Sequence, residues 1–133
     1  MDCIVTSIIS NLINNNNFTI GILGLAYKAN TNSVKNSPTL HLLRKIKNKK
    51  ILIYDPKAKL KKKIQDCHQV NSINYLLKNS NVIILMTPWP EFKKIHSFFK
   101  LNKNQKIILI DPHRIIDNEK IKRNRFKYFT IGK

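Results

Sequence analysis

The sequence predicts an α/β domain built on a mostly parallel sheet of five to six strands with helices on both faces. Four short runs rich in β-branched residues lack apolar–polar alternation, which indicates strands buried on both sides. Their starts lie 25 to 32 residues apart, enough for crossover segments between parallel strands. These runs are FTIGILGL from Phe18, KILIY from Lys50, NVIILM from Asn81 and KIILI from Lys106. A weaker fifth run, KYFTIG, follows from Lys127.

The segments between these runs carry helix signals. Ser37 is a good N-cap and Pro38 suits the first helical position, and Leu40, Leu43 and Ile46 then recur at helical spacing. We further expect short helices over Ser72–Leu77 and Pro90–Phe99, a short strand near Gln69–Val70, and a solvated charge run over Lys57–Lys63.

The N-terminal residues 1–17 are expected to form an amphipathic helix and an asparagine linker, ahead of one α/β domain over residues 18–133. The helix is predicted from paired apolar residues four apart, which make one strongly apolar face: Ile4, Val5, Ile8, Ile9, Leu12 and Ile13. That face either docks on the domain's own sheet or contacts another chain. We expect the second, a homodimer contact.

The chain is strongly basic, with 25 Lys and Arg against 7 Asp and Glu and a formal net charge of +18. Such a charge suggests a nucleic-acid partner. However, 21 of these cations are lysines and only four are arginines, and arginine is the residue that binds phosphate and guanine with two parallel hydrogen bonds. The many Lys, Ile and Asn residues also fit an A- and T-rich coding sequence, so nucleic-acid binding is the less favoured interpretation.

Membrane, secretory and metal classes receive no support. No apolar stretch approaches the ~20 residues of a membrane-spanning helix. Asp2 stands where a secretory signal would carry positive charge, so we expect a cytoplasmic protein. Cys3 and Cys67 lie far apart with no His or Cys at ligand spacing, which predicts neither a disulfide nor a metal site.

Candidate binding residues follow the strand runs, because doubly wound parallel sheets bind ligands beyond the carboxyl ends of their strands. If the strand order is 3-2-1-4-5-6, Lys28 and Thr87 flank the point where the order reverses. His113 and Arg114 then stand one strand away. Two or three cations around a cleft suit an anion such as a diphosphate.

A dinucleotide fingerprint is absent, because Gly21-Ile-Leu-Gly24 lacks the Gly-x-Gly-x-x-Gly turn. Both glycines are expected inside the first strand. Asp55 ends the second strand, where such folds often place a ribose-binding acid, but Asp-Pro also starts turns. We favour the turn.

Several blocks of this Rossmann-like pattern resemble one known domain. They are GILGLAYKANTNSVKNSPTLHLL, ILIYDPKA, NVIILMTPWPEFKKI, IILIDPHRIID and YFTIG. Their order resembles that of the C-terminal, UDP-binding domain of the UDP-glucose/GDP-mannose dehydrogenase family. The resemblance implies NAD-dependent oxidation of the C6 alcohol of a UDP- or GDP-sugar to a carboxylate, through a thioester on a cysteine.

The resemblance also implies roles for individual residues. Tyr27 and Lys28 match the aromatic–lysine pair that contacts the nucleotide sugar. Lys35 stands where the family usually has an arginine that reaches the NAD phosphates. His113 aligns with the substrate-contacting arginine of the family, and Arg114 follows it.

The family's catalytic cysteine, lysine and acid, and its NAD-binding domain, precede this region. We therefore expect no catalytic residue here, and NAD shared with an N-terminal half. Three hypotheses remain: the chain acts with a partner that supplies the chemistry, it is a stand-alone nucleotide-sugar-binding module or remnant, or, less favoured, it binds nucleic acid. The N-terminal helix resembles the tail of the family's connecting helix.

Overall fold

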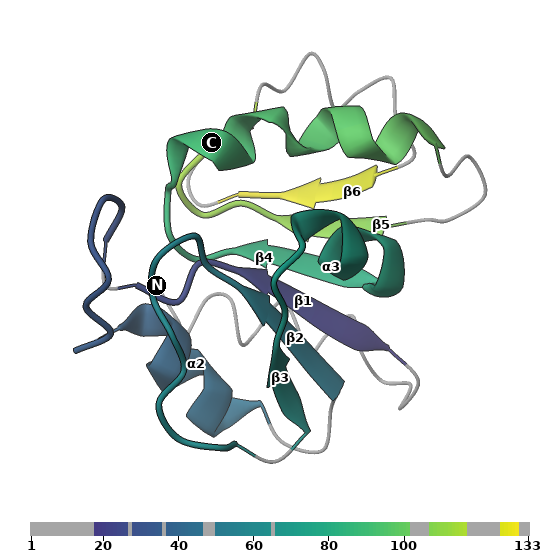
Figure 1. Ribbon diagram of the computed structural model, residues 1–133. Coiled ribbons are helices and arrows are strands. Elements are labelled where there is room, and N and C mark those ends of the chain that lie inside the picture. Colours follow the sequence, from purple (N-terminus) through teal and green to yellow (C-terminus); the bar gives the residue numbers. More distant parts are fainter. Residues whose placement is uncertain are drawn as a thin grey trace.

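The computed structural model describes residues 18–26, 28–35, 37–46, 50–64, 66–101, 107–116 and 126–130. These form a six-stranded parallel sheet in the order β3-β2-β1-β4-β5-β6 (Figure 1). The strands are β1 (Thr19–Leu23), β2 (Lys50–Tyr54), β3 (Cys67–Gln69), β4 (Val82–Leu85), β5 (Ile107–Ile110) and β6 (Phe126–Phe129). The predicted fold class and strand order are confirmed, while residues 1–17 and Tyr27 lie outside the described residues.

The central strands are buried on both faces, as their unbroken runs of Ile, Leu and Val predict. All four residues of β4 are buried, as are the last four residues of β1. In the register of the sheet, Ile22 lies between Ile53 of β2 and Ile84 of β4, and each of these three side chains is completely buried. The core therefore consists of aliphatic side chains, mostly Ile and Leu, packed against the sheet.

Helix α2 (Pro38–Lys45) begins where the sequence predicts. The Ser37 side chain accepts a hydrogen bond from the amide of Thr39 at 3.1 Å, and Pro38 occupies the first turn, where its missing N–H costs nothing. Arg44 and Lys45 lie in the last turn, where cations favour the helix dipole. The helix buries Leu42 and Leu43 against the sheet.

Helix α3 (Ile73–Asn79) lies in front of the sheet in the view of Figure 1. Ser72 caps it by accepting from the amide of Tyr75 at 3.2 Å, which confirms the predicted helix. Gly21 of β1 faces this helix, and a Cβ there would overlap the side chains of Leu76 and Ser80. Right-handed crossovers place α2 and α3 on opposite faces of the sheet, as the sequence predicts.

The segment Pro90–Leu101 forms a 3-10 helix, η1, where the sequence predicts a helix without specifying its type. Its first turn is bonded as a 3-10 turn, because the amide of Phe92 donates to the carbonyl of Trp89, three residues earlier. Phe92 and Ile95 are fully buried, which confirms the predicted apolar face for these two residues. Within the described residues, no helix is long and apolar enough to cross a membrane.

The connection from β2 to β3 carries no helix in its described residues 55–64, which we name the strap. Gln69 of β3 fixes the strap from both sides of its side-chain amide. Its Oε1 accepts from the amide of Leu60 at 2.7 Å and its Nε2 donates to the carbonyl of Ala58 at 2.8 Å. The lysines of the strap are exposed, as predicted for a solvated charge run, whereas Ala58 is buried.

Candidate functional site

The carboxyl edge of the sheet has its switch point between β1 and β4, because the chain runs outward from β1 to β3 and then returns to β4. Thr87, the second residue after β4, lies at this switch point. Its hydroxyl donates to the carbonyl of Ala26 at 2.9 Å, and only 1% of the residue is exposed. Thr87 therefore joins the two loops, and the structure gives it a packing role.

Gly24 lies after β1 and not inside it, so that part of the prediction is wrong. Its φ of 109° is a conformation that side chains on L-residues rarely adopt. A Cβ at this position would also overlap the side chain and amide of Thr87. Apolar residues continue on both sides of Gly24, so the sequence pattern predicts a longer first strand than the structure has.

The loop after β1 is held by side chains from two other elements. Thr39 of α2 donates to the carbonyl of Gly24 at 2.6 Å, and Ser37 donates to the carbonyl of Leu25 at 2.7 Å. The amides of Leu25 and Ala26 both donate to Oδ2 of Asp55, at 2.7 and 2.9 Å. In a dinucleotide-binding turn such amides face a phosphate, so here the chain's own carboxylate occupies that position.

Asp55 is a structural hub. Its Oδ1 accepts from the amides of Lys57 and Ala58 at 2.8 and 2.7 Å, and its Oδ2 accepts a further bond from the indole N–H of Trp89 at 3.2 Å. A carboxylate offers about four lone-pair positions, and donors of the protein itself occupy those of Asp55. The favoured turn interpretation is confirmed, and Trp89, with 4% of its surface exposed, packs in the core.

Asp111 repeats this arrangement after β5. Its side chain accepts from the amides of Ile115 and Ile116 at 3.0 and 2.9 Å and from the hydroxyl of Tyr128 at 2.9 Å. Burial and the bond to Asp111 raise the pKa of Tyr128, so the phenol stays protonated and donates. Sequence analysis missed this clamp, although the Asp-Pro dipeptide that follows both β2 and β5 is a shared signal.

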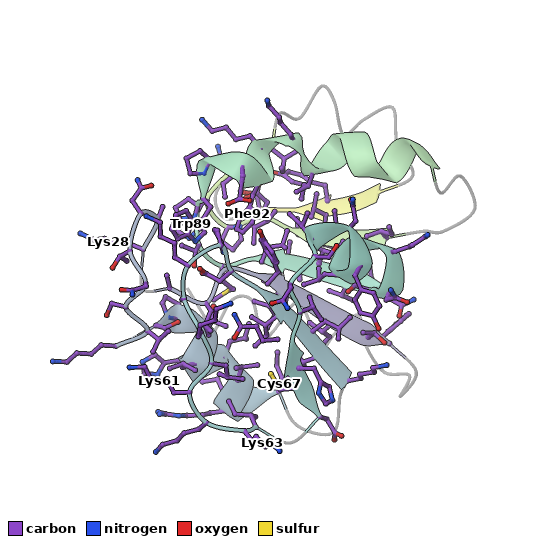
Figure 2. The ribbon with its side chains drawn as sticks, viewed as in Figure 1. Lys28, Lys61, Lys63, Cys67, Trp89 and Phe92 are labelled. Carbon is purple, nitrogen blue, oxygen red and sulfur yellow. The ribbon has the colours of Figure 1, made fainter. Side chains whose placement is uncertain are left out.

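Exposed basic residues lie at the same edge as this fixed base. Lys28 projects outward from the loop after β1 (Figure 2). His113 and Arg114 lie exposed in the loop after β5. The ring Nε2 of His113 lies 3.3 Å from the carbonyl oxygen of Met86, which draws this loop over β4. One strand separates the two groups, so their strands are about 10 Å apart. The structure thus places Lys28 and the His113/Arg114 pair at the same edge.

A shallow polar depression of about 430 Å³ adjoins this edge. Asn30, Thr31 and Asn32 line it from the loop after β1, and Lys57 lines it from the strap. Lys35, in the same loop, is exposed. Two amides, a hydroxyl and an ammonium are suitable donors for a phosphate. Sequence analysis missed Lys57, because nothing distinguishes it from the other lysines of its charge run.

Comparison with protein-family models matches residues 21–118 to the UDP-binding domain of the UDP-glucose/GDP-mannose dehydrogenase family. The chain belongs to this family. It is 32% identical over 121 residues to the UDP-glucose 6-dehydrogenase of Rickettsia felis, which covers 85% of this chain and 27% of that protein. It is 33% identical over 101 residues to the UDP-N-acetyl-D-mannosamine dehydrogenase of Pyrococcus horikoshii, covering 73% and 22% of the two chains.

Solved structures of dehydrogenases also match this chain. The UDP-D-ManNAc dehydrogenase of Pyrococcus horikoshii matches with a TM-score of 0.70 and 28% identity over 97% of this chain and 28% of that one. The NDP-N-acetyl-D-galactosaminuronic acid dehydrogenase of Methanosarcina mazei matches with a TM-score of 0.76 over 99% of this chain and 28% of that one, and at 14% identity it shows the fold alone. The chain thus spans about a quarter of the length of its relatives.

Proposed function

We propose that this domain binds the diphosphate of a UDP- or GDP-sugar at the carboxyl edge of its sheet. Lys28 supplies the principal charge, and Tyr27, His113 and Arg114 complete the contact. The observation that carries this proposal is that Asp55 and Asp111 are buried and bonded within the protein, whereas Lys28, Lys57 and Arg114 are exposed beside them and outnumber the exposed Glu91 near Tyr54. A cationic edge favours an anionic ligand.

We further propose that the domain acts within an NAD-dependent nucleotide-sugar 6-dehydrogenase of the cytoplasm. Lys35 and the polar depression formed by its own loop and Lys57 fit one phosphate of NAD, because their donors are ammonium, amide and hydroxyl groups. The amides after β1 do not fit it, since Asp55 already accepts from them. NAD supplies the hydride acceptor when bound, and the remaining contacts with it belong to another domain or chain.

Lys28→Ala should weaken binding of the nucleotide sugar about tenfold, because it removes a charge-assisted contact to phosphate. Titration calorimetry with UDP-glucose, UDP-N-acetylmannosamine and GDP-mannose should give the unaltered chain about −4 to −8 kcal/mol. Lys78→Ala, on α3, is the matched control and should leave the affinity unchanged. Absence of heat at millimolar ligand, or equal affinities of the two variants, would contradict the proposal.

The 133-residue chain incubated with NAD and these sugars should produce no NADH above background. Oxidation to the acid needs a thiolate that traps the aldehyde. Burial raises the pKa of Cys67 to about 11, and Cys67 begins β3 at the amino edge of the sheet, away from the candidate site. Sustained formation of NADH by this chain alone, abolished by Cys67→Ser, would contradict the expectation that the chain by itself does not catalyse the oxidation.

A further inference from the structure

A groove of about 500 Å³ lies between α2 and the strap, apart from the exposed cations of the carboxyl edge. Both elements lie on the face of the sheet opposite to α3, because successive right-handed crossovers in one direction cover the same face. The walls and floor are apolar, and they are formed by Val34, Leu40, Leu43, Leu60 and Ile64. A cavity of this size and lining is typical of binding pockets.

The groove is preformed. Leu43 on its α2 side is 4% exposed and belongs to the core, so that wall is fixed to the sheet. On the other side, Gln69 holds the strap at Leu60 and Ala58 through the two hydrogen bonds described above. The residues of the groove therefore lose little conformational entropy when a ligand binds.

Every charged residue that lines the groove is a cation. Arg44 contributes from α2, and Lys59, Lys61, Lys62 and Lys63 contribute from the strap; all five are exposed. Figure 2 shows Lys61 and Lys63 projecting outward beside α2. An apolar floor surrounded by positive charge complements a ligand that combines apolar groups with several negative charges.

We propose that this groove docks an acidic amphipathic segment of a partner protein. Its apolar side chains enter between Leu40 and Leu60, and its carboxylates pair with the lysines of the strap. Helices commonly bind grooves in this way. A nucleic acid fits less well, because the lining offers aliphatic side chains where bases would need aromatic platforms and only one arginine. A membrane surface fits less well because the apolar surface is concave.

The test uses a fluorescent helical peptide of about 15 residues, with leucines on one face and glutamates beside them. A second peptide has the same composition with the leucines spread around the helix, and a third replaces glutamate by lysine. Anisotropy at physiological ionic strength should show the first binding about tenfold more tightly than the second. The third should not bind. Equal binding of the first two would overturn the proposal.

Variants of the chain locate the site. Lys61→Glu/Lys63→Glu should weaken binding of the acidic peptide about tenfold. The control Lys78→Glu/Lys93→Glu makes the same change in net charge on α3 and η1, and it should change the affinity for the peptide less than about threefold. Leu60→Gln should weaken binding without a change in the thermal unfolding curve beyond a few degrees. Equal effects of the two double variants, or tighter binding of single-stranded DNA or anionic vesicles that depends on the same lysines, would refute a peptide groove.

Discussion

Asp55→Asn should lower the free energy of unfolding by about 3 kcal/mol or more, measured by urea denaturation. The two carboxylate oxygens of Asp55 accept four backbone amides and the Trp89 indole. Asparagine has the same shape, but it must turn its NH₂ group toward one set of these donors. Either orientation leaves buried N–H groups without acceptors and brings donors together.

Asp66→Asn is the matched control. Asp66 is exposed and has a φ of 61°, a conformation that asparagine adopts readily. Its unfolding free energy should therefore change by no more than about 0.5 kcal/mol. If Asp55→Asn were equally mild, Asp55 would not organise the loops after β1 and β4, and the rigid base proposed for the cleft would be lost.

The fold was predictable because its signals are local. A buried strand must be apolar on both faces, so VIIL at Val82–Leu85 indicates β4 without reference to its neighbours. Ser37 and Ser72 indicate helix starts because an N-cap bonds within its own turn. β3 was harder to predict, since its exposed His68 and its three residues give little pattern.

The site was predictable only in part, because its geometry depends on residues distant in sequence. Lys28 and His113 each follow a predicted parallel strand, and the carboxyl ends of parallel strands share one edge of the sheet. Their positions in the sequence were therefore enough to place both residues at that edge. The bond from Tyr128 of β6 to Asp111, the residue after β5, spans 17 positions, and the bonds from Leu25 and Ala26 to Asp55 span about 30 positions. The Asp-Pro dipeptide marks both aspartates, but no period or motif in a single sequence indicates their distant partners.

The hydrogen bonds of Asp55 also explain why the chain lacks the glycine-rich turn of a dinucleotide site. In that turn, backbone amides bind the phosphate. Here the amides of Leu25 and Ala26 are already bonded, and the amide of Thr39 at the start of α2 donates to Ser37. With these three amides occupied, we expect an anion at this edge to be bound mainly by side chains, which makes its affinity depend on lysine charge and on salt.

Gly24→Ala should lower the free energy of unfolding by about 3 kcal/mol or more, through two additive causes. A φ of 109° strains any L-residue other than glycine. The new Cβ would also overlap Thr87, whose hydroxyl bonds Ala26 across the switch point. The loop after β1 and the residues after β4 would have to move apart, because the atoms of Thr87 that the new Cβ overlaps are not the end of a long flexible side chain.

A double-mutant cycle with Thr87→Gly measures how much of the Gly24→Ala effect comes from overlap with the Thr87 side chain. That variant removes the overlap with the side chain of Thr87 but leaves the overlap with its amide nitrogen and the backbone strain. In that background Gly24→Ala should cost about 1 kcal/mol less than in the unaltered chain, as measured by urea denaturation. If Gly24→Ala costs the same in both backgrounds, Thr87 does not pack against this glycine. If it costs nothing in either, the left-handed turn after β1 is not the native conformation, and Lys28 is not held at the edge by the geometry described.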